Sequence, residues 1–166
     1  MKSRSIPSGF RPVRRDQLRE EREHDSYKLQ HKPPEPAACP DCGVIYHGGR
    51  WQWGLRPEGS HDLVCPACHR MRDHFPAGYV EIGGDFVGHH REELLKLMRH
   101  HEAKAKAEHP LARIMTIEDA ADGMLVTTTD IHLARDLGDA LHDAYQGELE
   151  FHYNEAEKLL RVHWRR

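Results

Sequence analysis

The sequence lacks the short patterns that mark the common classes of catalytic site. Its 166 residues contain no GxSxG, no GxxxxGK, no GxGxxG and no HExxH, and its many carboxylates do not single out an acid–base pair. They also contain no apolar run near the roughly 20 residues that a membrane helix needs, and no early hydrophobic segment like that of a secretory signal. We therefore expect a non-enzymatic cytoplasmic protein with no membrane association and no small-molecule substrate.

Cysteine is scarce, yet its few copies are paired. The chain has 4 cysteines, in CPDC at Cys39 and Cys42 and in CPAC at Cys65 and Cys68, with 22 residues between the pairs. Disulfides are rare in the reducing cytoplasm, which favours metal ligation or thiol redox chemistry. A Cys-x-x-Cys turn presents two thiolates to one metal ion, and two such turns at this spacing are typical of zinc ribbons. The sequence thus predicts one structural zinc ion held by all four cysteines.

Two other uses of these cysteines stay open. A rubredoxin-like iron centre has the same tetrahedral thiolate geometry. Dithiol redox chemistry needs an exposed thiol of low pKa, and no thioredoxin-like βαβ pattern surrounds either pair. With either metal, four thiolates leave no coordination position for water or substrate, which predicts a scaffold and not a catalytic ion.

Histidine is abundant, with 15 copies, and two doublets lie in or beside residues 90–108. His89, His90, His100 and His101 have no carboxylate placed as in a zinc-protease helix. We interpret them as solvent-exposed side chains and expect no second metal site.

The net charge of −3 is unevenly distributed along the chain. Residues 1–38 have a balance of +3, and residues 111–166 have one of −5. Short basic arms often contact nucleic-acid phosphates, which makes Arg11, Arg14 and Arg15 candidate RNA contacts. A solvated tail of mixed charge is the alternative, because acidic residues follow directly after this cluster.

Aromatic residues make up only 7% of the chain, but two tryptophans lie between the cysteine pairs. Zinc ribbons have very small cores, so we expect one of Trp51 and Trp53 to pack against the metal site and the other to be free for base stacking. The alternative is that both are buried and the nearby arginines are merely solvated. The candidate RNA-binding residues of this segment are Arg50, Trp51, Trp53, Arg56, Arg70 and Arg72.

Composition divides the chain into four parts. Residues 1–38 lack apolar periodicity and end in a proline-rich spacer, which predicts a disordered basic arm. Residues 39–75 form the expected zinc ribbon. Residues 76–110 are expected to contain a connector with one or two short strands, and a helix from about residue 90 to residue 108.

Residues 111–166 have the clearest periodicity. Two β-prone runs around DAADG predict a hairpin, and DIHLARDLGDALHDAYQG predicts a helix capped by Thr129 or Asp130 and by Gly147. Two alternating strands follow. The expected fold class is α+β: a zinc ribbon, a helix and a two-layer ββαββ domain.

The chain resembles a small bacterial relative of the large-ribosomal-subunit export adaptors, the archaeal and eukaryotic family named for nonsense-mediated decay. The resemblance lies in CPDCG, CPACHR, the RW after a short glycine segment, and DGMLVTTTDIHLARDLGDAL. It implies an adaptor that docks on ribosomal RNA and protein. These 166 residues contain one set of four cysteines where the family has more, and none of its later ribosome-binding domains, so subunit export is not implied.

These features together predict a non-enzymatic zinc-ribbon adaptor that binds RNA or a ribonucleoprotein, with the ribosome as the partner that the resemblance implies. Two alternatives remain. One is a protein-binding adaptor that acts through the acidic residues 111–166, since acidic surfaces repel phosphate. The other is a thiol redox or metal-responsive protein.

Overall fold

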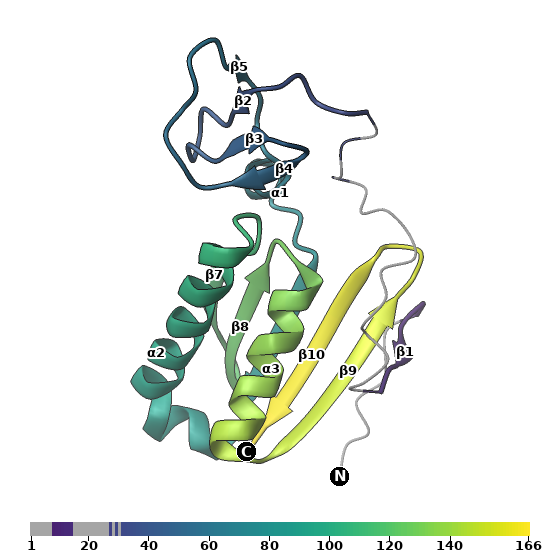
Figure 1. Cartoon of the computed structure of the whole chain (residues 1–166). Helices are drawn as coiled ribbons and strands as arrows, with labels where there is room; N and C mark the ends of the chain where they lie inside the picture. Colours follow the sequence, from purple (N-terminus) through teal and green to yellow (C-terminus); the bar gives the residue numbers. More distant parts are fainter. Residues whose placement is uncertain (1–7, 15–26, 28, 30) are drawn as a thin grey trace.

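The computed structural model describes residues 8–14, 27, 29 and 31–166. These residues form two sheets and three helices, arranged as a small ribbon module (residues 37–73) above a larger α/β module (residues 76–166) (Figure 1). Among the described helices, none is both long enough and apolar enough to cross a membrane.

The ribbon module consists of four very short strands and one helix. Its sheet has the order β4-β3-β2-β5. β3 and β4 form a hairpin through Gly48 and Gly49, whose φ angles of 61° and 79° match the twist that a two-residue hairpin loop requires. The elements are β2 (Ala37–Ala38), β3 (Ile45–His47), β4 (Arg50–Gln52), β5 (His61–Asp62) and α1 (Pro66–Asp73).

The core of the ribbon module is centred on the cysteines. So small an apolar core does not hold a fold by itself, and modules of this size depend on a metal ion or on disulfides. The buried residues that pack around the cysteines are Cys39, Val44, Cys65, Ala67 and Cys68. The stability of this module therefore depends on what the cysteines bind.

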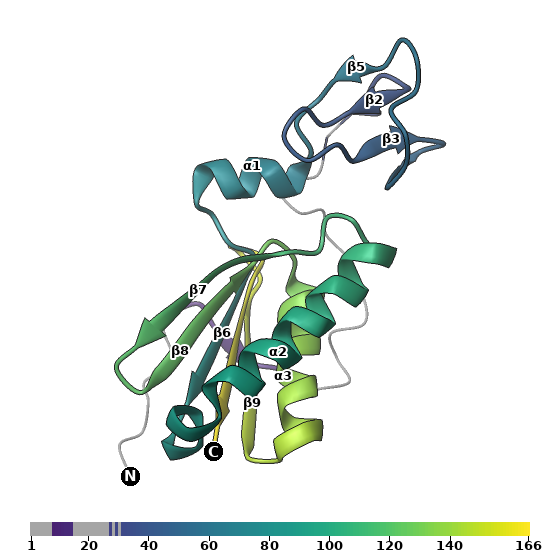
Figure 2. The ribbon, with the colours of Figure 1, turned by 90° about the vertical axis from the view of Figure 1, so that its left-hand side faces the viewer.

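The α/β module is a six-stranded sheet with both of its helices on one face (Figure 2). The strand order is β1-β9-β10-β6-β8-β7. The helices are α2 (Asp85–Glu108) and α3 (Ile131–Tyr145). The strands are β1 (Arg11–Pro12), β6 (Gly78–Gly83), β7 (Ile114–Ala120), β8 (Gly123–Thr128), β9 (Glu148–Asn154) and β10 (Leu159–Arg165).

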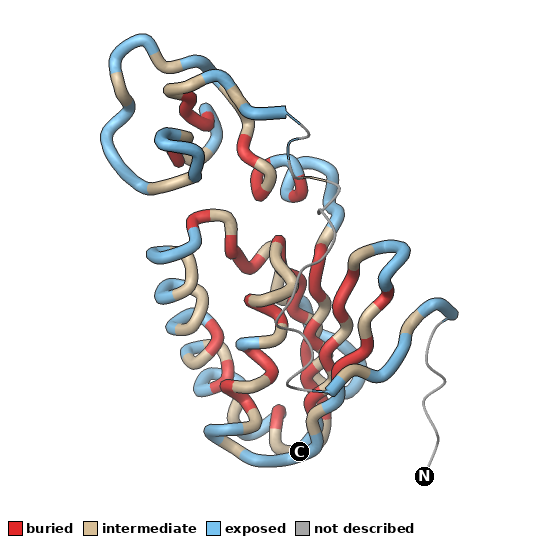
Figure 3. Tube along the Cα trace, turned by 45° about the vertical axis from the view of Figure 1, so that its right-hand side comes forward, coloured by how far each residue is buried: buried red, intermediate tan, exposed pale blue. Residues whose placement is uncertain are grey.

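Alternating apolar residues fill the layer between the sheet and its helices. Val80 of β6 is paired with Val126 of β8 and with Val162 of β10, and all three side chains are fully buried. Paired residues of neighbouring strands share a face of the sheet, so these valines form one row beneath the helices. Figure 3 shows this concentration of buried residues in the middle of the sheet. The helices contribute Leu94, Met98, Leu133, Leu137 and Leu141.

Local signals explain where the helices begin and end. The Asp130 carboxylate accepts a hydrogen bond of 2.8 Å from the backbone N–H of Leu133, which caps α3. The chain leaves α3 through Gln146 and Gly147, whose φ angles are 59° and 91°. α2 begins earlier than expected, at Asp85, and continues through a kink at residue 90.

The sheet differs from the expected four-stranded ββαββ unit. Strands and helix do follow residue 110 in that order, but β6, from the expected connector, lies between β10 and β8. The parallel pairing of β6 with β10 joins residues far apart in the chain, which local periodicity does not encode. β6 is thus a central strand of the larger sheet and not a linker.

Residues 8–14 also differ from the expected disordered arm. Arg11 and Pro12 form β1, which pairs with Tyr153 and His152 of β9. This short pairing attaches the segment to the edge of the α/β module. Of the rest of the expected arm, residues 1–7, 15–26, 28 and 30 lie outside the described residues, whereas Ala37 and Ala38 form the buried strand β2 of the ribbon sheet and not the end of a disordered spacer.

Candidate metal centre

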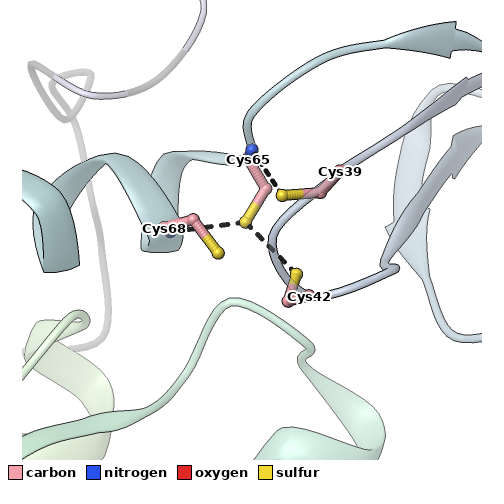
Figure 4. A group of neighbouring side chains, drawn as sticks. All are labelled: Cys39, Cys42, Cys65 and Cys68. Atoms are coloured by element: carbon pink, nitrogen blue, oxygen red, sulfur yellow. Dashed lines mark hydrogen bonds between the residues drawn. The ribbon is translucent and has the colours of Figure 1, made fainter.

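The four cysteines converge on one point between the two modules (Figure 4). The Sγ atoms of Cys39, Cys42, Cys65 and Cys68 all lie within 4.8 Å of one another, and those of Cys42 and Cys65 are 3.8 Å apart. A tetrahedral site with metal–sulfur distances of about 2.3 Å has sulfur–sulfur separations of about 3.8 Å. All four cysteines are free, and their spacing is compatible with a shared metal ion and too wide for a disulfide.

The first pair lies in a tight turn after β2. The backbone N–H of Cys39 donates to the carbonyl oxygen of Val44 at 2.8 Å, and that of Gly43 donates to the carbonyl oxygen of Cys39 at 2.9 Å. Gly43 has a φ of 78°, a conformation that glycine adopts without strain. This turn directs Cys39 and Cys42 toward the same point.

The second pair lies at the start of α1. Cys65 is the N-cap residue, its Sγ accepts from the backbone N–H of Cys68 at 3.4 Å, and Pro66 follows at the first helical position. The backbone N–H of Cys65 in turn donates to the Sγ of Cys39 at 3.3 Å. His69, which stands where the first turn has glycine, is part of this helix, so the second turn does not need a left-handed residue.

Arg113 is the functional residue that the sequence patterns did not reveal. Its guanidinium reaches the cluster from the α/β module: Nη1 lies 3.4 Å from the Sγ of Cys68, and Nη2 lies 3.1 Å from that of Cys42. Nε donates to the carbonyl oxygen of Pro110 at 2.9 Å, and the side chain is buried. The sequence gives one indication of this role: Arg113 is a charged residue at the start of an otherwise apolar strand segment.

The surroundings of the thiols act on their pKa values in opposite directions. Burial raises the pKa of the Cys42 thiol, but hydrogen bonds from the backbone of Val44 and from Arg113 outweigh it and lower the pKa to about 7. Burial raises the pKa of the Cys65 thiol, and it raises that of Cys68 to about 11. Buried thiols ionise together when a metal cation supplies the positive charge, so this donor set fits a thiolate-bound ion.

The chemistry of the donors is compatible with a zinc ion. Four soft sulfur ligands in tetrahedral spacing suit zinc, and iron accepts the same set. Three of the cysteines are buried, with exposed fractions of 1% for Cys39, 0% for Cys65 and 6% for Cys68. An ion bound by all four sulfurs would be closed to water and would act as a scaffold.

The two tryptophans of the ribbon module lie in different environments. Trp51 packs against the cysteine core, and its ring is 5.2 Å from that of Tyr46. Trp53 is 38% exposed, but its Nε1 donates to the carbonyl oxygen of Lys106 in α2 at 2.8 Å. Its ring also lies 5.6 Å from the guanidinium carbon of Arg113. Trp53 therefore contacts the α/β module. The expectation from the sequence was that one of the two tryptophan rings is free for base stacking.

Three of the candidate arginines already have partners within the ribbon module or directly after it. Arg56 donates to Asp62 at 2.7 Å. Arg72 makes a two-pronged pair with Asp41 at 2.6 and 2.8 Å, which joins α1 to the first cysteine turn. Arg70 is 3% exposed and donates to a backbone carbonyl oxygen. The Arg56 and Arg72 side chains are 51% and 54% exposed in these pairs, and exposed pairs of this kind contribute about 0–1 kcal/mol.

The remaining candidates lie on two different surfaces. Arg50 is exposed at the start of β4 and has no carboxylate partner among the described residues. Arg11 forms an ion pair with Glu155, and Arg14 is exposed nearby. Arg15 lies outside the described residues.

A cleft of about 840 Å³ separates the ribbon module from the α/β module. Its walls come from the β3–β4 hairpin, the start of α1, the end of α2 and the first turns of α3. Polar and aromatic side chains on these walls include Lys32, Arg50, Trp51, His109, His132 and Arg135. The cleft is therefore lined by both modules.

The histidine doublets have local contacts. The His90 ring stacks on that of Phe86 at 3.9 Å, and the His89 Nδ1 lies 3.3 Å from the carbonyl oxygen of Asp85. Within the part of the chain that the structure describes, the cysteines form the one group of ligating side chains close enough to share an ion.

Comparisons with protein-family models, curated proteins and solved structures find no match to this chain. The resemblance to the ribosomal export adaptors stays a prediction. In the residues that it describes, the structure shows an α+β arrangement with two sheets, three helices and a four-cysteine cluster that could hold a metal ion.

Proposed function

We propose that the protein is a non-enzymatic zinc-ribbon adaptor that binds RNA or a ribonucleoprotein, the ribosome being the partner that the family resemblance implies. The observation that supports it best is the position of Arg50 and Trp51. These two candidate RNA contacts are neighbours on β4, and both line the cleft between the modules. The exposed Arg50 offers a cation for a phosphate, and the part of the Trp51 ring that is not packed against the cysteine core offers a surface for a base of single-stranded RNA.

The charged side chains that line the cleft are four basic ones, Lys32, Arg50, Arg70 and Arg135, and three acidic ones, Glu108, Asp130 and Asp136, so the balance favours a phosphate by one positive charge only. Asp130 is engaged as the cap of α3, and Asp136 accepts a hydrogen bond from Arg135 at 3.1 Å. The Lys32 side chain is 75% exposed and pairs with Glu35 at 3.3 Å. Exposed pairs of this kind contribute little, about 0–1 kcal/mol, so a phosphate can replace the carboxylate at small cost.

The direct test is the affinity for a fluorescently labelled single-stranded RNA, measured by anisotropy at about 50 and about 200 mM salt. We expect binding that weakens with salt, and an Arg50→Ala variant that binds several-fold less tightly with a salt slope reduced by about 1. Arg56→Ala is the matched control, because Arg56 is an exposed arginine of the same module that does not line the cleft. An equal loss in both variants, or no binding at either salt concentration, would overturn the proposal.

Association with ribosomes needs its own experiment. We expect the protein to co-sediment with ribosomes at low salt and to dissociate at high salt, as phosphate contacts predict. Its absence from ribosomal and RNA fractions under every condition would remove the ribosome as partner.

A second candidate function is a protein-binding adaptor, and the acidic surface of the α/β module favours it. Asp143, Glu148 and Glu150 are exposed around the end of α3 and the start of β9. Such a surface suits a basic protein partner and repels phosphate. Pull-down from nuclease-treated lysate distinguishes the two functions, because a protein partner survives the loss of RNA and an RNA-bridged one does not.

A further inference from the structure

Arg113 belongs to the α/β module by its backbone and to the ribbon module by its side chain. Its backbone N–H donates to the Oγ1 of Thr129 at 2.9 Å, and its carbonyl oxygen accepts from the backbone N–H of Thr129 at 2.9 Å. The Thr129 hydroxyl also donates to the carbonyl oxygen of Leu111 at 2.6 Å. These bonds hold the backbone of Arg113 at the upper end of the large sheet.

The side chain extends from this anchor into the cysteine cluster. Two nitrogens of the guanidinium lie within 3.4 Å of the sulfurs of Cys42 and Cys68. These sulfurs come from different cysteine turns, so one planar group spans both halves of the ribbon's core. With four thiolates and one divalent ion the centre carries two net negative charges, and the buried guanidinium supplies a compensating positive charge.

A second contact lies beside this one. Trp53 donates its indole N–H to the backbone carbonyl oxygen of Lys106, and the centre of its ring lies 5.6 Å from the guanidinium carbon of Arg113. Two covalent connections join the modules: the short segment from His74 to Ala77, between α1 and β6, and the chain from β1 of the large sheet to β2 of the ribbon sheet. Side-chain contacts at the cysteine cluster add a non-covalent connection to these two.

We propose that the filled metal centre is the joint between the two modules, and that Arg113 is the positioning residue that locks it. The metal ion holds the sulfurs of Cys42 and Cys68 at the positions where the two terminal nitrogens of the Arg113 guanidinium, which form a planar fork, can both contact them. Without the ion, or without the fork, the ribbon module swings away from the α/β module and the cleft between them opens. This inference goes beyond the proposed function, since it concerns the protein alone and needs no RNA.

The decisive variant is Arg113→Met, which keeps an unbranched side chain of similar length but removes the charge and the fork. The experiment compares zinc-loaded wild type and variant by small-angle X-ray scattering, with limited proteolysis at residues 74–77 as a second readout. We expect the variant to keep one zinc ion per chain, to have a larger radius of gyration, and to be cut several-fold faster. Zinc-loaded protein is used because removal of the ion also disrupts the ribbon module itself.

Two further variants keep the result interpretable. Arg91→Met removes an exposed arginine of α2 that is paired with Asp119, and we expect wild-type scattering and cleavage from it. Arg113→Lys keeps the positive charge but lacks the planar fork. We expect its radius of gyration and cleavage rate to rise as in Arg113→Met, but by less. If Arg113→Met does not fold, the Arg113→Lys variant is compared with wild type instead. Zinc-loaded Arg113 variants with the wild-type radius of gyration and cleavage rate would overturn the proposal, whatever the outcome of the RNA experiments.

Discussion

Gly78 sets the distance between α3 and the sheet. A Cβ at this position would lie 2.4 Å from the Cβ of Ala134 and 2.5 Å from the Oγ1 of Thr128. Atoms that close must move apart, yet β6 is held on both sides by β8 and β10. The absence of a side chain is therefore a packing requirement of the α/β module.

Replacing Gly78 by alanine tests this requirement. We expect Gly78→Ala to lower the free energy of unfolding by about 1–3 kcal/mol, the usual cost of overpacking a core. Gly88→Ala in α2 is the control, because nothing lies within 4 Å of its Cβ position, and it should leave stability unchanged or raise it by up to about 1 kcal/mol. Urea unfolding followed by circular dichroism measures both, and equal midpoints would contradict this packing account.

At the scale of elements, α3 is the helix on which the cleft and the core both depend. Its buried leucines pack on the sheet, and its first turn forms one wall of the cleft. The Asp130 cap determines where that first turn begins. A loss of the cap would therefore loosen the cleft wall before it affects the core.

The cap has a measurable contribution. We expect Asp130→Ala to cost about 1 kcal/mol of stability, because the N–H of Leu133 loses its acceptor, and Asp130→Ser to recover most of it. Thermal unfolding of the three proteins at one concentration checks the order. An alanine variant as stable as wild type would show that the cap is dispensable.

At the scale of the whole molecule, the features that could be predicted from sequence are those encoded locally. The two Cys-x-x-Cys turns identified the four sulfurs that converge, because each turn carries its ligands within a few residues. α3 and its N-cap at Asp130 were predicted for the same reason, whereas its C-cap is Gln146, one residue before the expected Gly147. Each of these depends on contacts between near neighbours in the chain.

The features that could not be predicted depend on contacts between distant residues. The placement of β6 beside β10 joins segments about half the chain apart, and no periodicity within β6 reveals its partners. Arg113 lies 45 residues from Cys68 in sequence and 71 from Cys42. Likewise, only the fold shows that Arg56 and Arg72 are paired while Arg50 faces the cleft.

The central claim is that four sulfurs hold one ion that stabilises the ribbon module. The most direct measurement is the metal content per chain of purified wild-type protein and of Cys65→Ser, combined with an NMR spectrum before and after chelation. The account predicts one zinc ion per wild-type chain, its loss in the variant, and disappearance of the dispersed signals of residues 37–73 on chelation while those of the sheet persist. Metal-free wild-type protein with an unchanged, fully dispersed spectrum would contradict it.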